Sequence, residues 1–250
     1  MAELKKVAFI TGGNRGIGFE TARELAEEGI HVVIGARDSA QGTNAAEKLR
    51  QLGLKAESIV FEATKSVDIE SAVKYFQDKF GRLDILVNNA GVMIEFENAS
   101  ARRSNQTSTT SADVLRKTFD INFFAPVALT QALLPLLRKS PAGRIVNLSS
   151  ILGSLALHAD SKSSVYNGKV FAYDASKTAL NAFTIHLAHE LKNTKIKVNS
   201  AHPGWVKTAM GGDSAPTAVV DGAKTSVQLS LLAEDGPTGG FFHQGETLPW

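Results

Sequence analysis

Short apolar segments alternate with longer amphipathic segments along most of this chain. The apolar segments are rich in β-branched residues, as strands are, and they lie at residues 7–10, 32–34, 58–61, 83–87, 144–148 and 196–199. Helical patterns follow the first three, over about 16–28, up to about 52, and over about 69–80. Continuous apolar strands separated by helices predict a parallel sheet covered on both faces, which is a doubly wound, Rossmann-like α/β fold.

The pattern contains no internal repeat and no break in composition, so we expect a single domain over residues 1–250. Two polar stretches, residues 95–111 and 158–168, interrupt the alternation and are typical of surface loops. The second stretch has two interpretations, a tolerated insertion or a wall of a substrate pocket.

Composition narrows the classes of function. Hydrophobic residues make up 43% of the 250 residues, charged residues 21%, and the net charge is +2. A charge so close to zero argues against nucleic acid or an anionic membrane as the main partner. No apolar run was found that approaches the roughly 20 residues of a membrane helix, and the first residues lack a signal-peptide layout. We therefore expect a cytoplasmic protein.

Two further classes of chemistry are disfavoured by residue type. The chain has no cysteine, which excludes disulfides and thiol catalysis. Its six histidines show no metal-ligand spacing, so we expect no metal site.

A glycine-rich segment follows the first strand and begins the first helix. Its glycines are Gly12, Gly16 and Gly18. Glycine lets the backbone approach a pyrophosphate closely, and the N-terminus of the following helix offers free N–H groups to the anion. A glycine triplet alone is a weak signal, but its place between a strand and a helix predicts a dinucleotide site.

The end of the second strand distinguishes the two nicotinamide cofactors. An acidic residue there suits the ribose hydroxyl of NAD, whereas arginine suits the 2′-phosphate of NADP. Arg37 stands at this place, and Arg15 lies within the glycine loop. Two guanidinium groups near one phosphate favour NADP(H); two solvated surface charges are the alternative. Asp38 is interpreted as the N-cap of the next helix, or as a ligand of the ribose.

Tyr173 and Lys177 carry the candidate chemistry. Residues four apart lie on one face of a helix, and an ammonium beside a phenol lowers the phenol pKa. Such a phenol can donate a proton to a ketone oxygen. The chain holds its own comparison, because Tyr75 and Lys79 have the same spacing without these companions. We interpret Tyr75 as packing and Lys79 as a solvated charge.

Taken in order, these motifs resemble the short-chain dehydrogenases/reductases over almost the whole chain. The matching residues are the glycine loop of residues 11–18, Asn-Asn-Ala-Gly at 88–91, Asn122, Ser150 with Gly153, Tyr173 with Lys177, and Pro203 with Gly204. Within that family the chain is most similar to the carbonyl reductases. The Arg37-Asp38 pair, the long interval between Ser150 and Tyr173, and the tail from Gly236 carry this similarity.

The resemblance implies a role for each matching residue. Tyr173 would be the general acid, Ser150 would bind the substrate oxygen, and Lys177 would hold the nicotinamide ribose and lower the Tyr173 pKa. Asn122 would anchor a water that relays protons. Cofactor contacts are implied for Gly12, Asn14, Arg15, Gly16, Ile17, Gly18, Arg37, Glu62, Ala63, Asn89, Ala90, Gly91, Tyr173, Lys177, Pro203, Gly204, Val206 and Thr208.

The sequence therefore predicts NADPH-dependent reduction of a small-molecule ketone or aldehyde. The long interval between Ser150 and Tyr173 departs from the common family pattern, so we expect either a monomer or a small homo-oligomer. Two alternatives stay open. One is a 3-oxoacyl-carrier-protein reductase, for which Arg102 and Arg103 are the candidate docking patch, and the other is an NADP-sensing protein without catalysis.

Overall fold

One sheet of eight strands organises the computed structural model, which describes residues 6–96 and 106–250. The strand order is β3-β2-β1-β4-β5-β6-β7-β8. Neighbouring strands are parallel except β7 and β8. The strands are β1 (Val7–Thr11), β2 (His31–Ala36), β3 (Ala56–Val60), β4 (Ile85–Asn88), β5 (Arg144–Leu148), β6 (Lys197–Ala201), β7 (Phe241–His243) and β8 (Glu246–Thr247).

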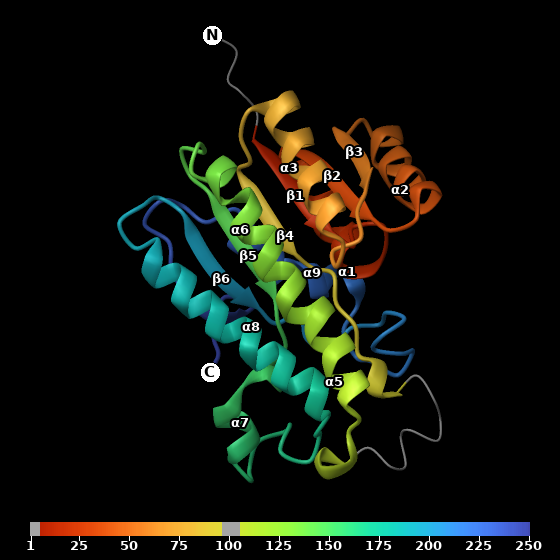
Figure 1. Ribbon diagram of the computed structural model, residues 1–250, viewed down its shortest axis with the longest axis vertical. Coiled ribbons are helices and arrows are strands. Elements are labelled where there is room, and N and C mark those ends of the chain that lie inside the picture. The colour runs from red at the N-terminus through yellow and green to blue at the C-terminus, as the bar shows by residue number, and fades with distance from the viewer. Residues whose placement is uncertain (1–5, 97–105) are drawn as a thin grey trace.

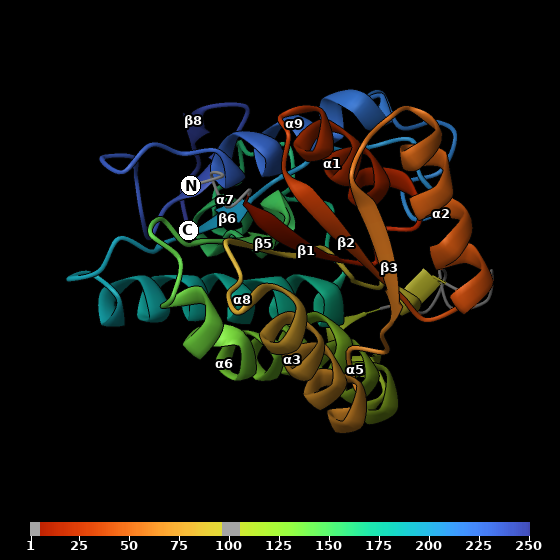
Figure 2. The same cartoon turned by 90° about the horizontal axis from the view of Figure 1, so that it is seen from above.

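Helices cover both faces of the sheet, which confirms the doubly wound fold (Figure 2). One layer holds α1 (Gly16–Glu27), α2 (Ser39–Gln51) and α9 (Val219–Ser230), and the other holds α3 (Ser66–Phe80), α6 (Ala125–Leu137) and α8 (Phe171–Glu190). Each layer encloses a hydrophobic cluster, one around Ile10 and Leu25 and the other around Phe9 and Phe76. The inner strands β1, β2, β4, β5 and β6 are buried almost throughout, which explains their apolar runs, whereas β3 at the edge is mostly half-buried.

The chain order reverses between β1 and β4, which are neighbours in the sheet although two strands separate them in sequence. In open α/β sheets such a reversal leaves a crevice at the carboxyl ends of the strands. The loops after β1, β4 and β5 therefore meet at one edge.

The helical run Ala112–Leu137 is long and apolar enough, by length and composition, to cross a membrane. The expectation that no apolar run approaches this length is wrong here, because α5 (Ala112–Phe119), a π-helical segment η3 (Asp120–Phe124) and α6 join into one continuous helical run. In the structure this run packs against α3 and α8 as part of the helical layer, and α5 lies beside α8 (Figure 1). Packing of this kind is that of a core helix.

Short elements that the sequence did not predict lie within the polar stretches or just before them. The 3₁₀ turns η1 (Ile94–Phe96) and η2 (Thr107–Thr109) belong to the first stretch, and the 3₁₀ turn η4 (Ile151–Gly153) and the short helix α7 (Leu155–Ala159) lead into the second. The expectation of a surface loop from residue 95 is wrong at its first residue, because Glu95 is only 4% exposed. Residues 97–105 of that stretch, with Arg102 and Arg103, lie outside the described residues.

Candidate active site

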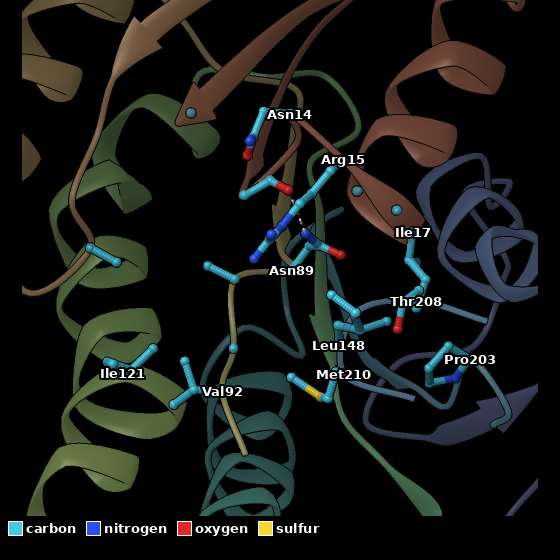
Figure 3. Close-up of a pocket in the computed structure, with 18 of the residues that line it drawn as sticks. Asn14, Arg15, Ile17, Asn89, Val92, Ile121, Leu148, Pro203, Thr208 and Met210 are labelled. Atoms are coloured by element: carbon cyan, nitrogen blue, oxygen red, sulfur yellow. Dashed lines mark hydrogen bonds between the residues drawn. The ribbon is translucent and has the colours of Figure 1, made fainter. Parts of the chain in front are cut away.

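A cavity of about 490 Å³ opens at the carboxyl edge of the sheet. Figure 3 shows Asn14 and Arg15 of the glycine loop at one end, and Val92, Ile121 and Met210 toward the other. Most of the residues predicted to bind the cofactor line it: Gly12, Asn14, Arg15, Gly16, Ile17, Gly18, Arg37, Glu62, Ala63, Asn89, Ala90, Gly91, Tyr173, Lys177, Pro203 and Thr208. Sequence segments that lie far apart in the chain thus converge on one space.

The loops after β1 and β4 are locked together by side-chain bonds. Asn89 Nδ2 donates to the carbonyl oxygens of Thr11 at 2.7 Å and Gly12 at 3.2 Å. The Thr11 hydroxyl accepts from the backbone N–H groups of Asn89 and Ala90, both at 3.0 Å. A Cβ at Gly18 would lie 2.4 Å from Asn89 Nδ2, so only glycine permits this close approach.

The N-terminus of α1 faces this cavity without a side-chain cap. Its N-cap residue, Arg15, makes no capping bond, and the first turn contains no acidic residue. Gly16 has φ of +55°, a left-handed conformation that glycine adopts without strain. The free N–H groups and the helix dipole suit an anion, so this cradle fits the pyrophosphate of a dinucleotide.

Arg15 and Arg37 both line the cavity, as predicted for a 2′-phosphate site. The Arg37 side chain is 68% exposed, and its Nε lies 3.8 Å from Glu62 Oε2. Asp38 Oδ1 accepts from the N–H of Gln41 at 2.9 Å, which confirms Asp38 as the N-cap of α2. Two guanidinium groups are therefore available to a phosphate at this end.

Tyr173 and Lys177 lie on one turn of α8 and are both buried. Lys177 Nζ is 5.6 Å from the centre of the Tyr173 ring and donates to the Leu148 carbonyl at 2.8 Å. Burial raises the pKa of Tyr173 to about 12, against the lowering effect of its hydrogen bond with Ser150. Burial also lowers the pKa of Lys177 to about 8. The predicted lowering of the Tyr173 pKa is wrong here, because desolvation of the phenol outweighs the influences that favour the phenolate.

The second tyrosine–lysine pair lies outside the cavity, as expected. The Tyr75 hydroxyl donates to Glu57 Oε2 at 2.6 Å, and its ring packs against the core cluster around Phe76. Lys79 forms an ion pair with the same Glu57. Packing of Tyr75 is confirmed, and so is the interpretation of Lys79 as a solvated charge, since its side chain is 44% exposed although it pairs with Glu57.

Ser150 stands at the start of η4, next to the Tyr173 phenol with which it forms a hydrogen bond. Its Oγ accepts from the N–H of Leu152 at 3.2 Å. The following N–H, of Ile151, donates to Nδ1 of His202 at 3.2 Å, and burial lowers the pKa of His202 to about 3. The neutral imidazole is thus an acceptor that holds the turn carrying Ser150.

Asn122 is fully buried within the π-helical segment η3. Its Oδ1 accepts from the N–H of Val92 at 2.8 Å, and its Nδ2 donates to the Val92 carbonyl at 2.8 Å and to Ser176 Oγ at 3.0 Å. A Cβ at Gly91 would lie 3.3 Å from Asn122 Oδ1 and 3.4 Å from Lys177 Nζ. Asn122 therefore lies close to Lys177, and its side chain fixes the loop after β4. Its predicted water relay stays a prediction.

The loop after β6 closes the cavity from the opposite side. Pro203 and Thr208 line it, and the Thr208 methyl would lie 3.4 Å from a Cβ at Gly16. Gly204 and Val206, also predicted to bind the cofactor, are not among the lining residues. Val206 is only 4% exposed, because its side chain packs against Gly222.

Several lining residues were not among the cofactor contacts predicted from the sequence: Gly35, Phe61, Val92, Ile121, Leu148, Ser149, Lys207, Ala209, Met210 and Val219. Val92 and Ile121 adjoin the predicted Gly91 and Asn122, and this adjacency was the available signal. No residue of 158–168, a stretch that the structure describes in full, lines the cavity. Of the two interpretations of that stretch, a pocket wall is therefore wrong for this cavity, whereas residues 207–210 after β6 do line it.

Comparisons with known proteins show the family to which the chain belongs. The sequence matches the short chain dehydrogenase family over residues 6–218. It is 32% identical to (-)-isopiperitenone reductase of Mentha piperita, with 99% of each chain covered. The structure resembles NADPH-bound carbonyl reductase from chicken fatty liver, with a TM-score of 0.83, 26% identity, and coverage of 99% and 100%. It also resembles salutaridine reductase from Papaver somniferum, with a TM-score of 0.80, 29% identity, and coverage of 96% and 99%.

Proposed function

The chain belongs to the short-chain dehydrogenase family, and on that basis we propose that it reduces ketones and aldehydes to alcohols with NADPH. The observation that carries the proposal is the placement of Tyr173 and Lys177 in a cavity that also receives the glycine loop and Arg37. A dinucleotide and a carbonyl compound could then be held in one space. The reductases among its relatives support carbonyl reduction as the reaction.

The lining residues divide the cavity into regions of different chemistry. The uncapped N-terminus of α1 and the glycine loop would hold the pyrophosphate, while Arg15 and Arg37 would bind the 2′-phosphate. Lys177 and Pro203, which also line the cavity, would hold the nicotinamide end. When bound there, NADPH supplies the hydride that adds to the carbonyl carbon.

Tyr173 is the proton donor in this proposal. With a pKa raised to about 12, its phenol keeps its proton at neutral pH, and it donates that proton to the carbonyl oxygen as negative charge develops there. The Ser150 hydroxyl bonds to the phenol and favours the phenolate that is left. The ammonium of Lys177, four residues along the same helix, adds positive charge beside that phenolate.

Replacing Tyr173 by phenylalanine tests this assignment. We expect Tyr173→Phe to lower turnover by at least about a hundredfold, because it removes the proton donor, while NADPH binding stays within about twofold. The measurement is loss of NADPH absorbance with a panel of ketones, together with NADPH fluorescence for binding. Tyr75→Phe is the matched control, since it removes a phenol with the same lysine spacing outside the cavity.

The same panel separates the alternatives. Consumption of NADPH with simple ketones supports the proposal, whereas consumption only with 3-oxoacyl thioesters would identify a carrier-protein reductase. Binding of NADPH without consumption by any substrate would identify a sensing protein. Near-normal turnover by Tyr173→Phe would remove the tyrosine from the mechanism.

A further inference from the structure

Glu95 is a buried carboxylate that the proposed reaction does not use. It lies in η1, four residues beyond Gly91 of the cavity wall, and it is only 4% exposed. Burying a carboxylate is costly unless hydrogen bonds compensate for the lost water. Its two oxygens accept from two backbone N–H groups of α8: Ala172 donates to Oε1 at 2.6 Å, and Tyr173 donates to Oε2 at 3.0 Å.

These bonds occupy the N-terminus of the helix that carries Tyr173. The N-cap residue of α8, Val170, offers no side-chain bond to the first turn. Glu95 takes that place from another segment of the chain, and its negative charge suits the positive end of the helix dipole. Asp174 accepts from the N–H of Val170 at 2.9 Å, so a second carboxylate completes this end.

Both polar groups of the Tyr173 backbone are therefore held by side chains. Glu95 accepts from its N–H, and Ser176 Oγ donates to its carbonyl oxygen at 2.7 Å. Ser176 Oγ in turn accepts from Asn122, whose carboxamide also binds the backbone of Val92. The segment after β4 thus contacts the tyrosine along two separate routes, one from Val92 and one from Glu95.

We propose that Glu95 is a positioning residue that fixes the main chain of Tyr173 and thereby aims its phenol into the cavity. This proposal rests on the proposed role of Tyr173 as proton donor. A small displacement of a reacting group has a large effect on rate, since about 1 Å of misplacement can cost about a hundredfold. The N-terminus of α8 is held by its own chain and also by Glu95. Being held by both limits the displacement of Tyr173.

Glu95→Gln is the informative substitution, because the amide keeps the shape but offers one acceptor oxygen to two N–H groups. We expect kcat to fall at least about tenfold, while Kd for NADPH and KM for the ketone stay within about twofold. Glu95→Ala, which offers no acceptor, is expected to lower kcat further. This split between kcat and binding is not what a general loss of stability produces.

Glu57→Gln is the matched control. Glu57 is also a glutamate held by neighbouring groups, namely the side chains of Tyr75, Lys79 and His31, and it lies on β3 outside the cavity. We expect this variant to lose thermal stability while keeping kcat within about twofold. If Glu57→Gln lowers kcat as much as Glu95→Gln does, stability alone explains the effect and the proposal is overturned.

Amide hydrogen exchange tests the proposal without any turnover. In Glu95→Gln, the N–H groups of Ala172 and Tyr173 should exchange at least about tenfold faster than in the unmodified protein, and in Glu57→Gln they should not. Unchanged exchange at these two amides would overturn the proposal whether or not the protein reduces ketones. A protein that consumes no NADPH with any carbonyl compound contradicts the proposed function instead, and the exchange result then decides the role of Glu95 alone.

Discussion

At the scale of single residues, two tyrosine–lysine pairs with identical spacing have different surroundings in this molecule. Tyr75 and Lys79 both contact Glu57, so the carboxylate of Glu57 neutralises the positive charge of Lys79. Lys177 has a carbonyl oxygen as its partner instead, and its Nζ lies above the Tyr173 ring. Only the second lysine keeps an unneutralised charge beside a phenol, and only that pair lines the cavity.

Lys177 provides a prediction of pH dependence. Burial lowers its pKa to about 8, so the ammonium is present below that pH and is lost above it. We expect kcat/KM for NADPH to fall as pH rises above about 8, since this parameter reports the groups of the free enzyme. Initial rates at saturating ketone, from about pH 6 to about pH 10, measure the profile.

Two variants check the assignment of that alkaline limb. Lys79→Met should keep the limb, because Lys79 lies outside the cavity. Lys177→Met should lose the limb and show rates lower by at least about tenfold at every pH. An unmodified protein whose kcat/KM stays level to about pH 10 would contradict the role of Lys177.

The sequence could identify these residues but not their electrostatic state. Spacing and order are visible in the chain, and they were enough to bring Tyr173, Lys177 and Arg37 to one cavity. Desolvation depends on every atom around a group, so the upward direction of the Tyr173 pKa could not be predicted from residue types. Glu95 was overlooked for the same reason, because its polar neighbours in sequence do not show that it is buried.

At the scale of elements, the contact between η4 and α8 sets the distance between Ser150 and Lys177. A Cβ on Gly153 would lie 2.9 Å from both C and Cβ of Lys177, closer than real Cβ contacts. Gly153→Ala must therefore push the turn away from the helix. We expect a loss of about 1–3 kcal/mol in the free energy of unfolding and a decrease in kcat of at least about tenfold.

Gly168→Ala is the control for that substitution, because its Cβ would meet Val165 O at an ordinary 3.6 Å. It should change the free energy of unfolding by no more than about 0.5 kcal/mol and leave kcat unchanged. Urea unfolding and ketone-dependent rates measure both effects. If Gly153→Ala behaves like Gly168→Ala, the close contact does not position Ser150.

The N-terminus of α8 also predicts how stability depends on pH. Burial raises the pKa of Asp174 to about 7, the bond from Val170 and the charge of Lys169 oppose this, and the charge of Glu95 adds to it. His158 Nε2 lies 3.3 Å from the same carboxylate. The pKa of Asp174 in the folded state thus exceeds its ordinary value near 4. The proton bound to Asp174 stabilises the folded state in full below about pH 4, and this contribution is lost as the pH rises through about 7.

Asp174→Asn removes this titration while keeping an oxygen for the Val170 N–H. Between about pH 5.5 and about pH 8.5, its stability relative to the unmodified protein should improve by about 2 kcal/mol. Urea unfolding at the two pH values measures the change. A difference that is the same at both values would show that Asp174 does not titrate in this range.

Elements with a strong hydrophobic period were predicted well, and those defined by tertiary contacts were not. The expected strands coincide with β1 to β6 to within a few residues, because buried parallel strands are apolar throughout. The short β7 and β8 were missed, since three and two residues carry no period. The π-helical segment includes Asn122, whose side chain binds the backbone of Val92, and local sequence does not contain this contact.

At the scale of the whole molecule, the proposed cofactor site joins both halves of the sheet. The glycine loop, Arg37 and Glu62 belong to the half built on β1, β2 and β3. Lys177 and Thr208 belong to segments that follow β5 and β6. A ligand that contacts both halves binds only the folded chain, so it stabilises the fold by mass action.

This arrangement predicts a thermal shift that depends on the 2′-phosphate. At about a hundredfold excess over its Kd, NADPH should stabilise the protein by about 2.7 kcal/mol, which raises Tm by about 5–10 °C for a chain of this size. Arg37→Ala should lower NADPH affinity by about tenfold, or about 1.4 kcal/mol at the same concentration. Its effect on NADH should be small, because NADH has no phosphate for the guanidinium to bind.

Scanning calorimetry with each cofactor measures both shifts, and Arg116→Ala is the control. Arg116 is an exposed arginine of α5 paired with Asp113, outside the cavity. Replacing Arg116 should leave the thermal shifts with NADPH and NADH unchanged. This result would show that the position of the Arg37 charge, and not the net charge of the protein, determines the shift. An equal decrease of the NADPH and NADH shifts in Arg37→Ala would place Arg37 against a part common to both cofactors. In that case the choice of NADP(H) would have to rest on Arg15 alone.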